Sequence, residues 1–127
     1  RKRLQASGLQ LEIEGAYVAH DLDRLHDGVD VALAIYDPGR GNISHGALPV
    51  RMFEAAARGV PSVVNADVLM ADVAVAEGIG VPCAWDDPQA LCDALLQARG
   101  LSLSDDAGVM PTSDRAAWLD AVVRLMP

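Results

Sequence analysis

The feature that most constrains the fold of this chain is an apolar run without alternation, which extends from Asp30 to Tyr36. A strand with one face in water alternates polar and apolar residues, whereas a strand covered on both faces is apolar throughout. Strands of the second kind occur in parallel sheets that carry helices on both faces. The turn signal Asp37-Pro38-Gly39 ends the run. The run therefore predicts an interior strand of a parallel α/β sheet.

Strand and helix patterns alternate along the rest of the chain. Alternating apolar and acidic residues over 11–16 predict a first strand at a sheet edge. The apolar period and the flanking Gly and Pro residues predict further strands at 61–65 and 79–84, and helices at 20–27, 50–59, 70–77 and 88–98. The order β-α-β-α-β-α-β-α-α implies an α/β fold with a Rossmann-like, doubly wound parallel sheet.

The length of 127 residues is sufficient for one domain with its own core. We expect a single domain over 1–127, in which 100–111 form a loop and 112–126 form a final helix with an apolar stripe. The chain begins with Arg1 and enters a strand pattern almost at once. We therefore expect it to be a fragment of a longer protein.

The net charge and the two cysteines limit the partners and the cellular compartment that we expect for this chain. A net charge of −8 disfavours nucleic acid as a partner. No apolar run approaches the roughly 20 residues that span a bilayer. Cys83 falls in a predicted strand and Cys92 on a predicted helix, without CxxC spacing. We expect both to be buried thiols in a reducing compartment, and hence a cytoplasmic location.

A glycine-rich loop from Gly39 to Pro49 leads into the helix at 50–59. Loops that leave the carboxyl end of a parallel strand are where such sheets bind ligands. Residues 38–66 carry three arginines and one acid, a local charge of +2 in an acidic chain. This charge fits a pocket for an anion such as a nucleotide diphosphate. It fits equally a solvated helix face on which Arg51, Glu54 and Arg58 form pairs three and four residues apart.

The run from 47 to 64 resembles the "GLPxKxxEyxAxGxPVV" signature of glycosyltransferases and reads ALPVRMFEAAARGVPSVV. The signature is typical of the donor-binding, C-terminal domain of the GT-B fold, especially in the large retaining family 4. Segments before it (15–36) and after it (77–96) are also similar, so the resemblance covers about residues 11–99. It implies one half of a GT-B architecture, in an enzyme that moves a sugar from a nucleotide-sugar donor to a glycan, lipid or small molecule, for example in polysaccharide biosynthesis.

The resemblance also implies a site. Glu54 takes the position of the glutamate that binds the ribose hydroxyls of the donor, and Arg51 stands where lysine is common. Four loop residues are expected to contact the diphosphate or sugar through their backbone amides: His45, Gly46, Ala47 and Leu48. The His45 side chain could also donate a hydrogen bond to phosphate. The implied ligand is the donor itself, with no separate cofactor and no metal, since no His/Cys/Asp/Glu set has metal spacing.

Two departures leave alternatives open. Gly46 stands where the family has a second glutamate that contacts the donor sugar, and the usual phosphate-binding Arg/Lys pair cannot be placed. No catalytic residue is identified. We expect the acceptor site, and any peripheral association with a membrane, on an N-terminal domain of the same protein, so that this fragment alone is inactive. The alternatives are a catalytically degenerate sugar-nucleotide-binding module and a nucleotide-sugar epimerase of GT-B fold. A receiver-type signalling domain is a poor alternative, because it needs a lysine after a later strand and the only lysine in this chain is Lys2.

Overall fold

The computed structural model describes residues 8–13, 15–104, 107, 120 and 123–124. Within them lies a three-stranded parallel sheet of β1 (Ala32–Ala34), β2 (Ser62–Asn65) and β3 (Gly80–Cys83), in that order. The register pairs Leu33 with Val63 and Val63 with Val81. All four residues of β2 are buried, as its apolar run predicts. The prediction of an interior strand covered on both faces is wrong for β1, because β1 lies at an edge of the described sheet and Leu33 is 49% exposed.

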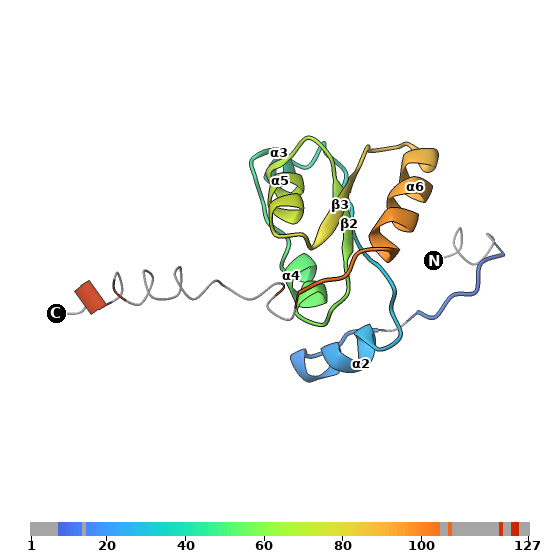
Figure 1. Cartoon of the computed structure of the whole chain (residues 1–127), viewed down its shortest axis with the longest axis horizontal. Helices are drawn as coiled ribbons and strands as arrows, with labels where there is room; N and C mark the ends of the chain where they lie inside the picture. Colours follow the sequence, from blue (N-terminus) through green and yellow to red (C-terminus); the bar gives the residue numbers. More distant parts are fainter. Residues whose placement is uncertain (1–7, 14, 105–106, 108–119, 121–122, 125–127) are drawn as a thin grey trace.

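Helices cover both faces of this sheet (Figure 1). On one face lie α3 (Gly41–Ser44), α4 (Val50–Ala56) and α5 (Leu69–Ala76), which pack on the side chains of Ala34 and Val64. On the other face lies α6 (Pro88–Arg99), which packs on Val63, Val81 and Cys83. The 3-10 helix η1 (Ala19–Asp21) and α2 (Leu22–His26) precede the sheet. The fold is thus α/β, with a parallel sheet flanked by helices, as the sequence predicts.

The predicted strand at 11–16 is wrong. Residues 9–13 and 15–18 contain no strand, and the side chains of Leu11 and Ile13 are 38% and 43% exposed. Alternation shows only that two faces of a segment differ in polarity. A strand also requires a neighbour to satisfy its backbone, and β1 pairs only with β2 among the described residues.

The remaining elements are close to their predicted positions; most are shorter, α5 is shifted by one residue, and α6 is one residue longer. The predicted N-cap of α6 is confirmed, because Asp87 Oδ1 accepts hydrogen bonds from the backbone N–H groups of Gln89 and Ala90 at 3.0 and 2.9 Å. The short helix α3, inside the predicted glycine-rich loop, was not expected. Most of the predicted final helix at 112–126 and half of the predicted loop at 100–111 lie outside the described residues.

The two cysteines differ in their environments. Cys83 is buried in β3, as predicted, whereas Cys92 is exposed on α6, so the prediction of a buried thiol is wrong there. On this helix the core-facing positions are Ala94 and Ala98. Cys92 lies two residues before Ala94, about 200° around the helix axis, and therefore on the opposite side.

Candidate functional site

The carboxyl ends of β1 and β2 are joined by one side chain. The amide of Asn65, the last residue of β2, accepts a hydrogen bond from Tyr36 N–H and donates one to Tyr36 C=O, both at 2.8 Å. The two bonds continue the parallel ladder beyond Ala34, where β1 ends. Asn65 is itself only 2% exposed. The edge of the sheet from which a ligand-binding loop would leave is therefore held in a fixed geometry.

Arg51 lies over this edge. Its guanidinium carbon is 5.6 Å from the centroid of the Tyr36 ring, within the range of a cation–π contact. Arg51 is in the first turn of α4, and its side chain is exposed. The guanidinium is charged at all physiological pH values. It is thus a cation at the carboxyl edge that contacts an aromatic ring, and no carboxylate among the described residues pairs with it.

Arg58 belongs to the other end of the sheet. Its Nε lies 2.8 Å from Asp23 Oδ1, and its Nη1 donates to the backbone oxygen of Glu54 at 2.9 Å. Seven residues separate Arg58 from Arg51, about 10 Å along a helix axis. The sequence placed the two arginines in one electropositive window, and the fold separates them. No ion pair joins Arg51, Glu54 and Arg58 in the structure, so the pairing that their spacing allowed does not form.

Glu54 lies between Arg51, in the first turn of α4, and Arg58, just beyond the end of that helix. Its side chain is half-buried, and no hydrogen bond or ion pair of its carboxylate occurs among the residues that the structure describes. It is three residues, about 4.5 Å of helix, from Arg51. Of the six residues predicted for the donor site, Arg51 and Glu54 are thus on one helix and the other four are in the segment before it.

The loop segment is more ordered than expected. The backbone N–H groups of His45, Gly46 and Ala47 donate to the carbonyl oxygens of Gly41, Ile43 and Asn42 at 3.0, 3.1 and 2.9 Å. These bonds close α3. Three of the four amides that we expected at a diphosphate are therefore already engaged within the protein.

Gly46 has a local reason to be glycine. Its φ is +88°, a left-handed value, and an added Cβ would lie 3.3 Å from the Cδ2 atom of Leu69. A glutamate at this position would be strained in the present backbone. The departure from the family signature therefore coincides with the end of α3, a helix that the family pattern did not predict. The His45 side chain is exposed at that helix end.

A cavity of about 290 Å³ opens at the carboxyl edge, on the face that α6 covers. Its walls include Ile35, which follows β1, and Cys83, which ends β3. The other residues that line it are Ala84, Trp85, Asp86, Asp87, Pro88 and Leu91. Trp85 is 48% exposed at this cavity.

The sequence did not predict this cavity, because Ile35 on one side and residues 83–91 on the other are far apart in the chain. A signal was nevertheless present, since Trp85 directly follows a predicted strand, where ligand-binding loops begin. Burial of the Cys83 thiol, and secondarily the negative charge of Asp87, raise the pKa of Cys83. The thiol is therefore neutral near pH 7, and its Sγ donates to Ala84 O at 3.3 Å.

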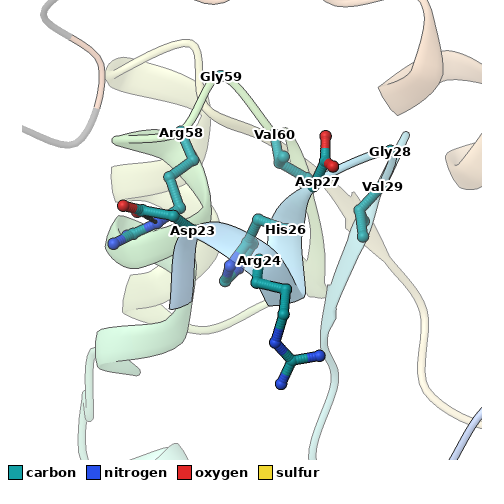
Figure 2. A pocket seen from close by; sticks show the side chains of 9 residues that line it. All are labelled: Asp23, Arg24, His26, Asp27, Gly28, Val29, Arg58, Gly59 and Val60. Atoms are coloured by element: carbon teal, nitrogen blue, oxygen red, sulfur yellow. Dashed lines mark hydrogen bonds and ion pairs between the residues drawn. The ribbon is translucent and has the colours of Figure 1, made fainter. Parts of the chain in front are cut away.

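A larger hollow, of about 760 Å³, lies at the opposite edge of the sheet (Figure 2). Arg58, Asp23 and His26 line it, together with Val29 and Val60, which precede β1 and β2. Its position at the amino ends of the strands is not where parallel sheets bind ligands. The positive charge of Arg58 is also already paired there. The carboxyl edge is thus the better candidate site.

The described part of the chain shows neither a metal-binding cluster nor a membrane-spanning helix. No three His, Cys, Asp or Glu side chains gather there in a way that could hold a metal ion. No helix in that part has the length and apolar character that crossing a membrane requires.

Comparisons with known proteins leave the family open. No protein-family model, no curated protein and no solved structure matches this chain. The class that the fold and the candidate site define is therefore a parallel α/β domain with a cationic, partly apolar carboxyl edge.

Proposed function

We propose that this chain is the donor-binding domain of a glycosyltransferase and that it binds a nucleotide sugar at the carboxyl edge of its sheet. One observation carries the proposal: the segment that resembles the family signature leaves β1, forms α4 and enters β2, and it puts Arg51 over Tyr36 at that edge. A parallel sheet flanked by helices, with a loop and helix leaving a carboxyl end, is the setting in which such folds bind nucleotides.

The roles of the residues follow from their chemistry. Arg51, with the exposed Arg40, supplies positive charge for the diphosphate, which leaves as an anion when the sugar is transferred. Glu54 offers a carboxylate that can accept hydrogen bonds from the two hydroxyls of the ribose. His45, Gly46, Ala47 and Leu48 border the site, and Leu48 retains the amide that α3 does not use. We assign no catalytic residue, and we expect the acceptor to be bound by another domain of the same protein.

Two features favour the alternative of a binding module without transfer activity. Gly46 provides no carboxylate for the donor sugar, and the neighbouring amides are engaged in α3. An epimerase of GT-B fold would need further catalytic carboxylates. Cys83 and Cys92 form no disulfide with each other, which fits the cytoplasmic location that we propose for either function.

The test is calorimetric titration of UDP, GDP and ADP, and of their sugars, into the chain. We expect at least one diphosphate to bind, and Arg51→Ala and Glu54→Gln each to weaken that binding about ten-fold, equivalent to about 1.4 kcal/mol. Arg58→Ala is the matched control, two residues beyond the end of the same helix, and should leave binding unchanged. Absence of binding by every nucleotide diphosphate would defeat the proposal. A donor that binds but is epimerised by the chain alone would favour the epimerase.

A further inference from the structure

The cavity at Trp85 has one polar group that is not engaged. Asp87 Oδ1 caps α6, and the Cys83 thiol donates to Ala84 O. The carboxylate of Asp86 makes no hydrogen bond or ion pair within the part of the chain that the structure describes. Asp86 also has a φ of +57°, an uncommon conformation for a residue with a side chain.

The walls of the cavity are suited to a flat, largely apolar group. Ile35, Leu91 and Pro88 are aliphatic, and the indole of Trp85 is half exposed beside them. Stacking of a nucleobase on an aromatic side chain contributes about 1–3 kcal/mol. A cavity of about 290 Å³ is small for a ligand site, so it takes one ring system rather than a whole nucleotide sugar.

The position of the cavity connects it to Arg51. Ile35 lines the cavity, and the next residue, Tyr36, carries Arg51 on its ring. Consecutive side chains of an extended segment point to opposite faces, and their Cα atoms are about 3.8 Å apart. A ligand that crosses the end of β1 therefore meets the cavity on one side and the guanidinium on the other.

We propose that this cavity binds the base of the nucleotide and that Asp86 selects guanine. The inference rests on the proposed function, since it takes the ligand to be a nucleotide. Guanine presents two adjacent N–H donors, N1–H and the N2 amino group, which match the two acceptor oxygens of a carboxylate. Uracil presents one N–H between two carbonyl oxygens, which a carboxylate repels. The cavity takes the guanine ring against Trp85, while the phosphates extend toward Arg51.

The test uses the fluorescence of Trp85 in the chain that carries Trp118→Phe, in which Trp85 is the only tryptophan. GDP and guanosine are titrated beside UDP and uridine. We expect saturable quenching by GDP and guanosine, and at least about ten-fold tighter binding of GDP than of UDP. Asp86→Asn should abolish this preference. Asp67→Asn is the matched control, because Asp67 also has a positive φ, +60°, and follows the end of the neighbouring strand β2 without lining the cavity.

Thermal unfolding of each variant shows that the fold is retained. Equal binding of GDP and UDP, unaffected by Asp86→Asn, would overturn the inference and leave the proposed function standing. Quenching by guanosine that the diphosphate does not strengthen would support the cavity and contradict the phosphate site. If neither nucleosides nor nucleotides bind, both proposals are wrong.

Discussion

The side chain of Asn65 satisfies both backbone polar groups of Tyr36, with two hydrogen bonds of 2.8 Å between β2 and the end of β1. This buried amide extends the parallel ladder by one step beyond the three residues of β1 that pair through their backbones. It also fixes the backbone on which the Arg51–Tyr36 contact and the wall at Ile35 depend.

We expect Asn65→Leu to lower the free energy of unfolding by about 2–4 kcal/mol, because the N–H and C=O of Tyr36 lose their partners in a partly buried position. Urea denaturation followed by circular dichroism measures the change. Asn42→Ala, at an exposed side chain, should change stability by no more than about 0.5 kcal/mol. A similar small effect at Asn65 would show that the two bonds are dispensable.

We expect Gly80→Ala to destabilise the fold by about 1–3 kcal/mol or more. A Cβ at Gly80 would lie 2.6 Å from the carbonyl oxygen of Ser62 on the neighbouring strand and 3.3 Å from the Cβ of Ala74. A backbone carbonyl oxygen and an alanine Cβ cannot rotate out of the way, so the backbone of the neighbouring strand must move. Gly15→Ala is the control, since no atom lies within 4 Å of its added Cβ. The midpoint of thermal unfolding should fall clearly for the first variant and stay near the parent for the second.

The raised pKa of Cys83 predicts a loss of stability in alkali. Below the pKa of the unfolded thiol, near 9, the folded and unfolded chains both hold the proton, and the group contributes no penalty. As the pH rises above that value, the unfolded chain releases the proton first, so the stability of the fold decreases until the pH passes the higher pKa of the folded state. Denaturation of the parent and of Cys83→Ala from pH 8 to pH 11 should show a steeper decline for the parent.

Thiol reactivity gives a second measurement at neutral pH. Cys92 is exposed and should react with a thiol reagent at once, whereas the buried, neutral Cys83 should react only as the fold opens. Two rapid equivalents of reagent in the native chain would contradict the structure.

Arg51, in the first turn of α4, and Arg58, two residues past the end of that helix, should have separate effects. We expect Arg51→Ala to leave stability within about 1 kcal/mol of the parent, the size of an exposed cation–π contact, while weakening nucleotide binding. Arg58→Ala removes an exposed ion pair with Asp23 and should cost about 1 kcal/mol or less, without any effect on binding. The same loss of binding in both variants would mean that the ligand lies along the whole helix rather than at the carboxyl edge.

The sequence by itself determined the class of fold and the position of most elements. The apolar runs specify where β1 and β2 lie, although only β2 is buried on both faces, and Asp87-Pro88 specifies the start of α6, because both signals act within a few residues. The cationic character of Arg51 is likewise fixed by residue type. These local properties do not depend on which other segment of the chain lies nearby.

Tertiary structure alone decided which residues meet. The segment at 11–16 has the alternation of a strand but pairs with no strand among the described residues, and Arg58 pairs with Asp23, 35 residues away. The cavity joins Ile35 to Trp85, from the ends of strands on either side of β2, and this juxtaposition exists only once β1, β2 and β3 have paired. Sequence patterns specify local geometry and burial, whereas contacts between distant segments follow from the packing of the whole sheet and its helices.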